Sequence, residues 1–247
     1  MARWIEGTVA GQKRWTERLY SLSVNAEIAP FEAGQFAKLA LAFDGEMLAR
    51  PYSFVNAPDE RPHEFYYVTL PEGPLTQRLC RLGPGDSVFL APQASGFLVL
   101  SEVRDAEALW LIASGTGIGP FLSILKTEAP WRRFRQVVLV RAARQAQELT
   151  YRDCIERLMS SHPEQMRVVS FLTRDRQPGL LEGRVPAAIE DGRLEAAAGV
   201  RLSAENSQVM ICGNPEMIVD TIEVLKRRGM KKHRRREPGH ITIENYW

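Results

Sequence analysis

Short segments of alternating hydrophobic and polar residues occupy much of the first hundred positions. The segments with this pattern are Trp4–Val9, Leu19–Val24, Gln35–Leu41, Glu64–Leu70 and Ser87–Leu90. Turn-forming pairs such as Asp44-Gly45 and Pro58-Asp59 separate them, and this spacing predicts the short strands of a β-barrel or a β-sandwich. One short helix is predicted after Pro74, because leucines recur there as Leu75, Leu79 and Leu82.

The pattern changes after about residue 102, where continuous apolar runs alternate with segments of helical period. The apolar runs are Ala108–Ala113, Val137–Val140, Val168–Leu172 and Val209–Cys212. The helical faces carry Tyr151, Ile155 and Leu158, and then Ile218, Ile222 and Leu225. Strands that are apolar on both faces predict a doubly wound parallel sheet covered by helices on both sides. We therefore expect two domains, residues 1–101 and 102–247.

Composition supports two domains of a soluble protein and excludes several kinds of site. The 247 residues exceed the size of most single cores, and 45% are hydrophobic while 25% are charged. No signal peptide and no apolar run of about 20 residues is visible, so we expect a cytoplasmic protein without a membrane span. The three cysteines lack the spacing of disulfide, zinc or iron–sulfur sites. Redox chemistry would therefore require an organic cofactor and no metal.

The first candidate for chemistry is Arg50-Pro51-Tyr52-Ser53. Pro51 favours an extended backbone, in which alternate residues share a face, so Arg50 and Tyr52 can project together. A guanidinium suits a phosphate, a tyrosine ring can stack on a flat cofactor, and Ser53 can hydrogen-bond to a ring nitrogen. An ordinary strand with an exposed arginine and a packed tyrosine explains the same residues equally well.

Three turns elsewhere could contact nucleotides. Thr76 follows Gly73-Pro74-Leu75 at a helix start, which suits a phosphate, although a plain helix cap is the stronger explanation taken alone. The glycine-rich turn Ser114–Pro120 follows an apolar run and favours nucleotide binding over a simple tight turn, although Pro120 replaces the last glycine of the dinucleotide fingerprint. In the third turn Asn214 caps and Pro215 starts a helix, two residues after Cys212 at a strand end.

The order and spacing of these four motifs resemble the ferredoxin–NADP+ reductase family. The bacterial ferredoxin/flavodoxin type is most similar, because it shares the ending from Arg234-Arg235-Arg236 to Tyr246-Trp247. The resemblance covers essentially the whole chain. It implies an N-terminal antiparallel FAD-binding β-barrel and a C-terminal doubly wound NADP-binding domain, whose tail returns to the FAD.

The resemblance also implies roles for individual residues. Arg50 would bind the FAD diphosphate, Tyr52 would stack on the isoalloxazine, and Ser53 would lie near its N5. The remaining FAD contacts would come from Pro51, from Tyr66, Tyr67, Val68 and Thr69, from Gly73, Pro74, Leu75 and Thr76, and from Tyr246 and Trp247. Thr116 would lie between flavin and nicotinamide. Cys212 would lie near the nicotinamide with Gly213, Asn214, Pro215 and Glu216, and the implied catalytic residues are Ser53 and Cys212.

Three arginines follow successive strands of the second domain and suit a 2′-phosphate. They are Arg144, Arg174 and Arg184, and family resemblance points to the same three. Surface ion pairs with Glu148, Asp175 or Glu182 are the alternative for any one of them. The arginines predict a strong preference for NADPH.

Eight basic residues and no acidic one lie between Lys226 and Arg236. A solvated helix end is the default explanation, but eight charges exceed what a helix terminus requires. Such a patch would attract an acidic carrier, and the carriers of this family, ferredoxin and flavodoxin, are acidic. A nucleic-acid partner is the generic alternative, and no accompanying motif supports it.

The expected reaction is hydride transfer between nicotinamide C4 and flavin N5, followed by release of single electrons to the carrier. We expect a monomer. Three other functions remain open from the sequence. They are a flavin or quinone reductase with small-molecule acceptors, a reductase-like subunit that binds FAD for regulation or assembly, and a nucleotide-binding module without flavin.

Overall fold

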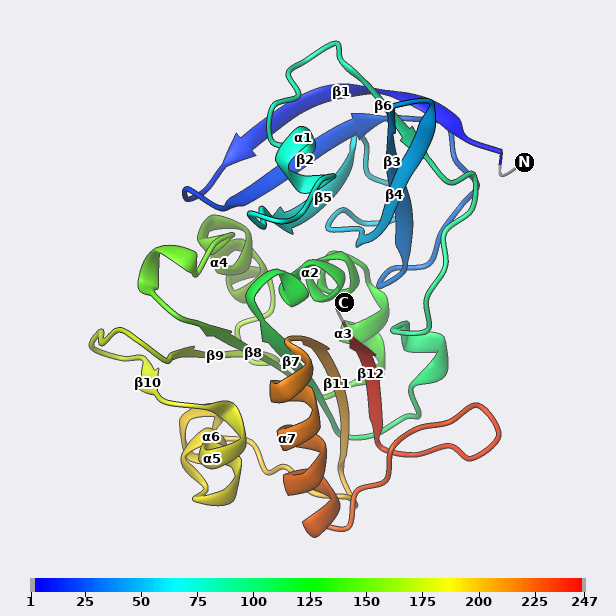
Figure 1. Ribbon diagram of the computed structural model, residues 1–247. Helices are drawn as coiled ribbons and strands as arrows, with labels where there is room; N and C mark the ends of the chain where they lie inside the picture. Colours follow the sequence, from blue (N-terminus) through cyan, green and yellow to red (C-terminus); the bar gives the residue numbers. More distant parts are fainter. Residues whose placement is uncertain (1–2, 246–247) are drawn as a thin grey trace.

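The computed structural model describes residues 3–245 and contains two six-stranded sheets, one after the other along the chain (Figure 1). The first sheet is antiparallel, with the order β4-β3-β6-β1-β2-β5. Its strands are β1 (Ile5–Arg14), β2 (Leu19–Asn25), β3 (Phe36–Phe43), β4 (Glu46–Ser53), β5 (His63–Val68) and β6 (Ser87–Leu90). An antiparallel bridge between Phe54 and Phe65 joins the two edges, so the sheet closes into the predicted barrel.

The barrel encloses its own hydrophobic core, which explains the alternation in the sequence. Leu22, Leu39, Phe65 and Leu90 are completely buried in that core. The short helix α1 (Thr76–Leu79) packs Leu79 against it, as predicted. Alternation alone did not identify β4 as a strand, because it contains Pro51. A proline is tolerated there since β4 is the first strand of the sheet order.

The second sheet is parallel and has the order β10-β9-β8-β7-β11-β12. Its strands are β7 (Ala108–Ser114), β8 (Gln136–Ala143), β9 (Met166–Leu172), β10 (Leu181–Glu182), β11 (Ser207–Gly213) and β12 (Ile241–Asn245). The chain adds strands to one side of β7 as far as β10 and then to the other side with β11. The switch point between β7 and β11 is where such sheets bind ligands.

Helices cover both faces of the parallel sheet, which confirms the doubly wound prediction (Figure 1). Leu109 and Leu111 pack with Phe121 on the face toward the barrel, whereas Trp110 packs with Ile218 on the other face. The first face carries α2 (Gly119–Leu125), α3 (Ala129–Arg133) and α4 (Arg152–Ser161). The second face carries α5 (Val185–Glu190), α6 (Arg193–Ala198) and α7 (Pro215–Arg227).

One hydrophobic cluster runs from the barrel into the parallel-sheet domain. Leu19, Val55 and Tyr66 of the barrel share it with Leu122 of α2 and Ile155 of α4. The junction is thus an apolar contact between the two units. Three short 3-10 turns complete the described chain: η1 (Leu100–Glu102), η2 (Gly115–Ile118) and η3 (Ala146–Glu148). Over residues 3–245, no helix has both the length and the apolar character that crossing a bilayer requires.

Candidate active site

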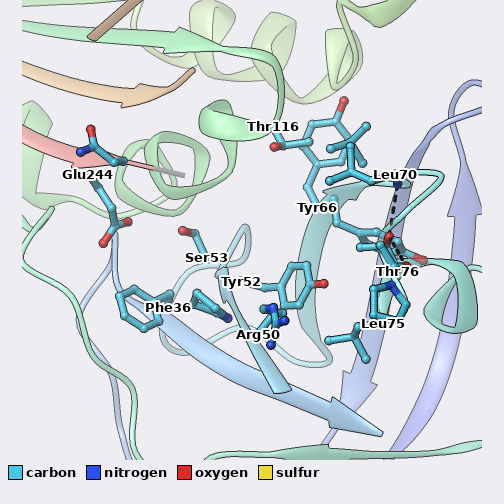
Figure 2. A pocket seen from close by; sticks show the side chains of 16 residues that line it. Phe36, Arg50, Tyr52, Ser53, Tyr66, Leu70, Leu75, Thr76, Thr116 and Glu244 are labelled. Carbon is cyan, nitrogen blue, oxygen red and sulfur yellow. Dashed lines mark hydrogen bonds between the residues drawn. The ribbon is translucent and has the colours of Figure 1, made fainter. Parts of the chain in front are cut away.

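A cavity of about 380 Å³ opens on the side of the barrel that faces the parallel sheet (Figure 2). Its walls come from β4, β5, the turn before α1, η2 and β12. The lining residues are Phe36, Arg50, Pro51, Tyr52, Ser53, Tyr66, Tyr67, Val68, Leu70, Gly73, Pro74, Leu75, Thr76, Thr116, Glu244 and Asn245. The first two predicted motifs therefore meet in one mainly aromatic and apolar cavity.

The end of β4 presents a cation beside an aromatic ring. Arg50 pairs with Leu39 of β3 and Tyr52 with Ala37, so the extended backbone places both side chains on one face, as predicted (Figure 2). Arg50 is exposed, and its Nη1 donates to the Ala49 carbonyl at 2.7 Å. Burial raises the pKa of the Tyr52 hydroxyl, which therefore stays neutral at physiological pH.

Two tyrosines of β5 form the opposite wall. Tyr67 donates from its hydroxyl to Gln12 Oε1 at 2.6 Å, and its ring meets Tyr52 edge to face with centroids 6.0 Å apart. Tyr66 accepts from the Thr150 hydroxyl at 2.9 Å. Both rings are held at their hydroxyl ends, so the cavity has fixed aromatic walls suited to a flat ligand.

The threonine in the turn before α1 forms its hydrogen bonds within that turn. Thr76 Oγ1 donates to the Gly73 carbonyl and accepts from the Leu70 amide, both at 3.2 Å. A side chain at position 73 would collide with Thr76, because a Cβ there would lie 2.5 Å from Oγ1. The hydroxyl stabilises this tight turn, and its contact to a phosphate stays a prediction.

Glu244 brings a carboxyl group into the cavity from β12, opposite Ser53 and Phe36 (Figure 2). Its Oε2 is buried and has no hydrogen-bond partner among the described residues. Burial raises the pKa of Glu244 to about 7, and a hydrogen bond from the Ser53 hydroxyl partly opposes that rise. The cavity therefore contains a carboxyl group that can gain or lose a proton near neutral pH.

A second cavity, of about 530 Å³, lies at the carboxyl ends of the parallel strands. Its polar lining includes Ser114, Arg144, Glu148, Thr173, Arg174, Arg184, Asn214, Glu216 and Asp220. Val68, Leu70 and Thr116 line both cavities, so the two spaces adjoin. Ligands in the two cavities would meet at these three residues.

The glycines at this switch point have two different purposes. A Cβ on Gly117 would lie 2.4 Å from the Cys212 carbonyl oxygen, and one on Gly213 would lie 2.3 Å from Ser114 Oγ. These two glycines let the ends of β7 and β11 approach each other. Gly115 has a positive φ of 53° and open space at its Cβ position beside the second cavity, so it can admit a ligand close to the backbone.

The predicted arginines gather around this second cavity. The Arg174 amide donates to the Arg144 carbonyl at 2.9 Å, which brings the loops after β8 and β9 together. Across residues 3–245, no ion pair involves Arg144 or Arg174. Arg184 lies 4.0 Å from Asp220, a partner that the sequence did not suggest. Two exposed guanidinium groups thus remain available to a phosphate.

The acids considered as alternative partners are engaged elsewhere. Glu148 accepts from the backbone amides of Arg144 and Gln145, at 2.8 and 3.2 Å. Asp175 accepts from the amide of Ala146 at 3.1 Å, and Glu182 pairs with Arg176 at 3.0 Å. These contacts shape the loops and do not neutralise the guanidinium groups of Arg144 and Arg174.

Comparison with known proteins identifies the family. Residues 111–223 match the oxidoreductase NAD-binding domain. The chain is 48% identical over its full length to the flavodoxin/ferredoxin–NADP reductases of Escherichia coli K12 and Shigella flexneri, and it covers all of both. The chain belongs to the flavodoxin/ferredoxin–NADP reductase family. A ferredoxin NADP+ reductase from Neisseria gonorrhoeae, solved with bound FAD and NADP, has 32% identity and a TM-score of 0.94 over 100% of both chains.

Most of the predicted residues of this reductase line one of the two cavities, but three do not. Cys212 is completely buried in the core cluster with Ile118, and Thr69 is buried with its amide donating to the Arg18 carbonyl at 2.7 Å. Pro215 starts α7 behind the capping residue Asn214. Their cofactor contacts stay predictions. Tyr246 and Trp247 lie outside the described residues.

Sequence reasoning missed several lining residues. Phe36, Leu70, Glu244 and Asn245 line the first cavity, and Arg18, Met217 and Asp220 line the second. Glu244 lies two residues before the aromatic ending Tyr246-Trp247 and follows the alternating Ile241 and Ile243 of a short strand. An acid in such a strand is a signal that could have identified it, because buried carboxyl groups are uncommon.

Proposed function

We propose that this reductase transfers electrons between NADP(H) and a small one-electron carrier protein, ferredoxin or flavodoxin, through bound FAD. The observation that carries the proposal is the shared rim of the two cavities at Val68, Leu70 and Thr116. Hydride transfer requires two rings in near-contact, and the fold provides adjoining spaces for them. Family membership supports the same reaction.

The residues of the first cavity fit FAD. Arg50 offers a cation for a diphosphate, and Tyr52 and Tyr66 offer rings for an isoalloxazine. Glu244 Oε2, which lacks a hydrogen-bond partner within residues 3–245, lies in the same cavity, where a polar ring edge would supply one. Bound FAD would supply the two-electron to one-electron conversion that amino acids cannot.

The protein itself would position the two rings, exclude water from them and provide one carboxyl group that can hold a proton. Ser53 is buried and lies between Tyr52 and the Glu244 side of the cavity (Figure 2). We propose that the Ser53 hydroxyl hydrogen-bonds to the flavin ring atom that receives the hydride. Glu244 would keep a proton close to the same ring atom. Cys212 would support the nicotinamide side from the base of the β7–β11 switch point.

Glu244→Gln is expected to change the pH dependence of stability in the FAD-free chain. The folded pKa is about 7 and the unfolded value is 4.5, so the unfolded state ionises first as pH rises. Burying the ionised group is unfavourable above pH 7, and this cost disappears as pH falls toward 4.5. The variant should be more stable than the wild type by about 1–3 kcal/mol above pH 7.

Urea unfolding of both proteins across pH 4–9 measures this difference. The two free energies of unfolding should converge at the acid end of the range. A constant difference at every pH would show that Glu244 titrates normally, and it would exclude Glu244 as the group that holds a proton in the cavity.

Several of the eight basic residues that the sequence predicted to attract the carrier form ion pairs within the protein. Lys226 pairs with Glu223, Arg227 with Glu190, and Arg228 with Glu195. Arg235 pairs with Glu102 at 3.1 Å. Half of the eight charges therefore have acidic partners, so the other four supply the net positive charge of the run.

The other four charges lie on a hairpin that precedes β12. Lys231, Lys232, Arg234 and Arg236 are exposed, and no ion pair within residues 3–245 involves them. The bridge between Arg234 and Glu237 closes the hairpin. We propose that these four residues attract an acidic carrier.

Reversing Lys231 and Lys232 to glutamate is expected to lower kcat/KM for the carrier about tenfold at low salt. The difference from the wild type should shrink as ionic strength rises, because screening weakens long-range attraction. Arg193→Glu on α6 is the control for the single variant Lys231→Glu, because each changes the net charge by two units and Arg193 already pairs with Asp191. Equal effects of both reversals, or no dependence on salt, would exclude the hairpin from docking.

We also propose a preference for NADPH over NADH, a monomeric state and a cytoplasmic location. Arg144 and Arg174 support the first of these, because they line the second cavity and form no ion pair within residues 3–245. The structure forms no disulfide within residues 3–245, which agrees with a reducing compartment.

The absorption spectrum of the purified chain is the first experiment. Flavin bands that persist through dialysis, and FAD released on denaturation, are the expected results. A colourless protein that does not take up added FAD would leave a nucleotide-binding module without flavin as the better account.

A further inference from the structure

Tyr151 has a backbone conformation that its residue type disfavours. It precedes α4 with φ 57° and ψ 27°, in the left-handed region, whereas the helical pattern predicted that it would form part of the helix. A non-glycine residue in this region is strained by about 1–2 kcal/mol. Other contacts of Tyr151 must therefore stabilise the conformation.

Those contacts reach across the junction to the barrel. The Tyr151 hydroxyl lies 2.6 Å from Ser21 Oγ and donates to Glu64 Oε1 at 2.7 Å. Its ring contacts Trp15, with centroids 4.7 Å apart, and Tyr66, with centroids 5.2 Å apart. A residue of the parallel-sheet domain is thus enclosed by strands β2 and β5 and the β1–β2 turn.

The hydrogen bonds form a chain in which each donor proton has its own acceptor. Trp15 Nε1 donates to Ser21 Oγ at 2.7 Å, so the Ser21 proton is free to point to Tyr151. Tyr151 in turn donates to the Glu64 carboxylate. Burial raises the pKa of Tyr151, which keeps the donating proton in place. Each hydroxyl donates once and accepts once, which favours mutual strengthening of the bonds.

The neighbouring residue continues this contact to the wall of the first cavity. Thr150 donates from its hydroxyl to the Tyr66 hydroxyl, while its carbonyl accepts from Arg141 Nη1 at 3.0 Å. Arg141 belongs to β8, whose loop carries Arg144 of the second cavity. A continuous set of contacts therefore connects the loop after β8 to Tyr66, which lines the first cavity.

We infer that Thr150 and Tyr151 are positioning residues that lock the parallel-sheet domain onto the barrel and so set the approach of the two rings. This inference rests on the proposed function. Neither residue lines either of the two cavities described above, so the effect passes through Tyr66 and the β8 loop. A displacement of about 1 Å between reacting groups can lower a rate about a hundredfold, so small changes at the junction are measurable.

The test uses the FAD-loaded chain and anaerobic stopped-flow reduction by NADPH. Tyr151→Phe keeps the ring but removes its two hydrogen bonds, and Thr150→Val removes the bond to Tyr66. Each should lower the rate constant of flavin reduction about tenfold at saturating NADPH, with weaker charge-transfer absorbance between flavin and nicotinamide. The KM for NADPH and the Kd for FAD should change less than about threefold, since no lining residue is altered.

Ser123→Ala is the matched control, because it removes a different bond across the same junction. Ser123 Oγ donates to the Asn56 carbonyl at 2.7 Å, and neither residue lines the first or the second cavity. Its rate constant should stay within about twofold of the wild type. Flavin content and the unfolding midpoint show whether each variant is folded. If Tyr151→Phe does not fold, Thr150→Val alone tests the positioning role.

Other outcomes are distinguishable. An unreduced flavin in the wild type would contradict the proposed function itself. Normal reduction in the wild type and in both junction variants would overturn only the positioning role. An equal loss of rate in Ser123→Ala would also overturn it, because any loosening of the junction would then suffice. A double variant Ser21→Ala with Tyr151→Phe should be no slower than Tyr151→Phe alone.

Discussion

Replacing both Arg144 and Arg174 by alanine is expected to raise the KM for NADPH by a factor of about 10² to 10⁴. Each guanidinium has no acidic partner in the described chain and faces the second cavity. A charge-assisted hydrogen bond contributes about 1.5–3 kcal/mol, and losing two of them gives that factor. The value of kcat should change little, because the 2′-phosphate is remote from the reacting carbon.

Steady-state kinetics with both nucleotides measure this effect. The KM for NADH should stay nearly unchanged, so the variant should lose most of its preference for NADPH. Arg176→Ala is the matched control, since Arg176 lies in the same loop but pairs with Glu182 and does not line the cavity. A wild-type enzyme that uses NADH as efficiently as NADPH would contradict the assignment of these arginines.

Ser53→Ala is expected to slow flavin reduction by about 10- to 100-fold while FAD binding weakens less than about threefold. The hydroxyl is buried in the first cavity and hydrogen-bonds to Glu244. In the proposed role, its loss would remove a polar contact to the ring atom that receives the hydride. The aromatic walls and Arg50 remain, so the cofactor should still bind.

Stopped-flow reduction and FAD titration of the same preparations separate the two effects. Ser87→Ala provides a control, because Ser87 donates to Glu6 at 2.7 Å and lines neither cavity. An unchanged rate of reduction in Ser53→Ala would reject the role. A parallel loss of rate and of FAD binding would make Ser53 a binding residue.

The periodicity of the sequence was sufficient to predict the two sheets. Apolar runs such as Ala108–Ala113 can only be buried on both faces, and the helices follow from that requirement. Local patterns were less informative at the edges. Strand β4 contains Pro51, and β10 contains only two residues, so neither shows a recognisable alternation of hydrophobic and polar residues.

The position of several candidate residues could be predicted from their chemistry and spacing. Arg50, Tyr52 and the three arginines line the two cavities, and their contacts with cofactors stay predictions. Tertiary contacts decided the other cases. Glu102, Glu190 and Glu195 are distant in sequence from the basic run that they partly neutralise. The interdomain role of Tyr151 likewise depends on partners more than 80 residues away.

Anaerobic sequential mixing tests the central claim most directly. The FAD-loaded chain is first mixed with NADPH and then with oxidised flavodoxin or ferredoxin. The visible flavin absorbance should fall in the first step and recover in the second as the carrier becomes reduced. A flavin that NADPH does not bleach, or a bleached flavin that leaves both carriers oxidised, would contradict electron transfer from NADPH to a carrier protein.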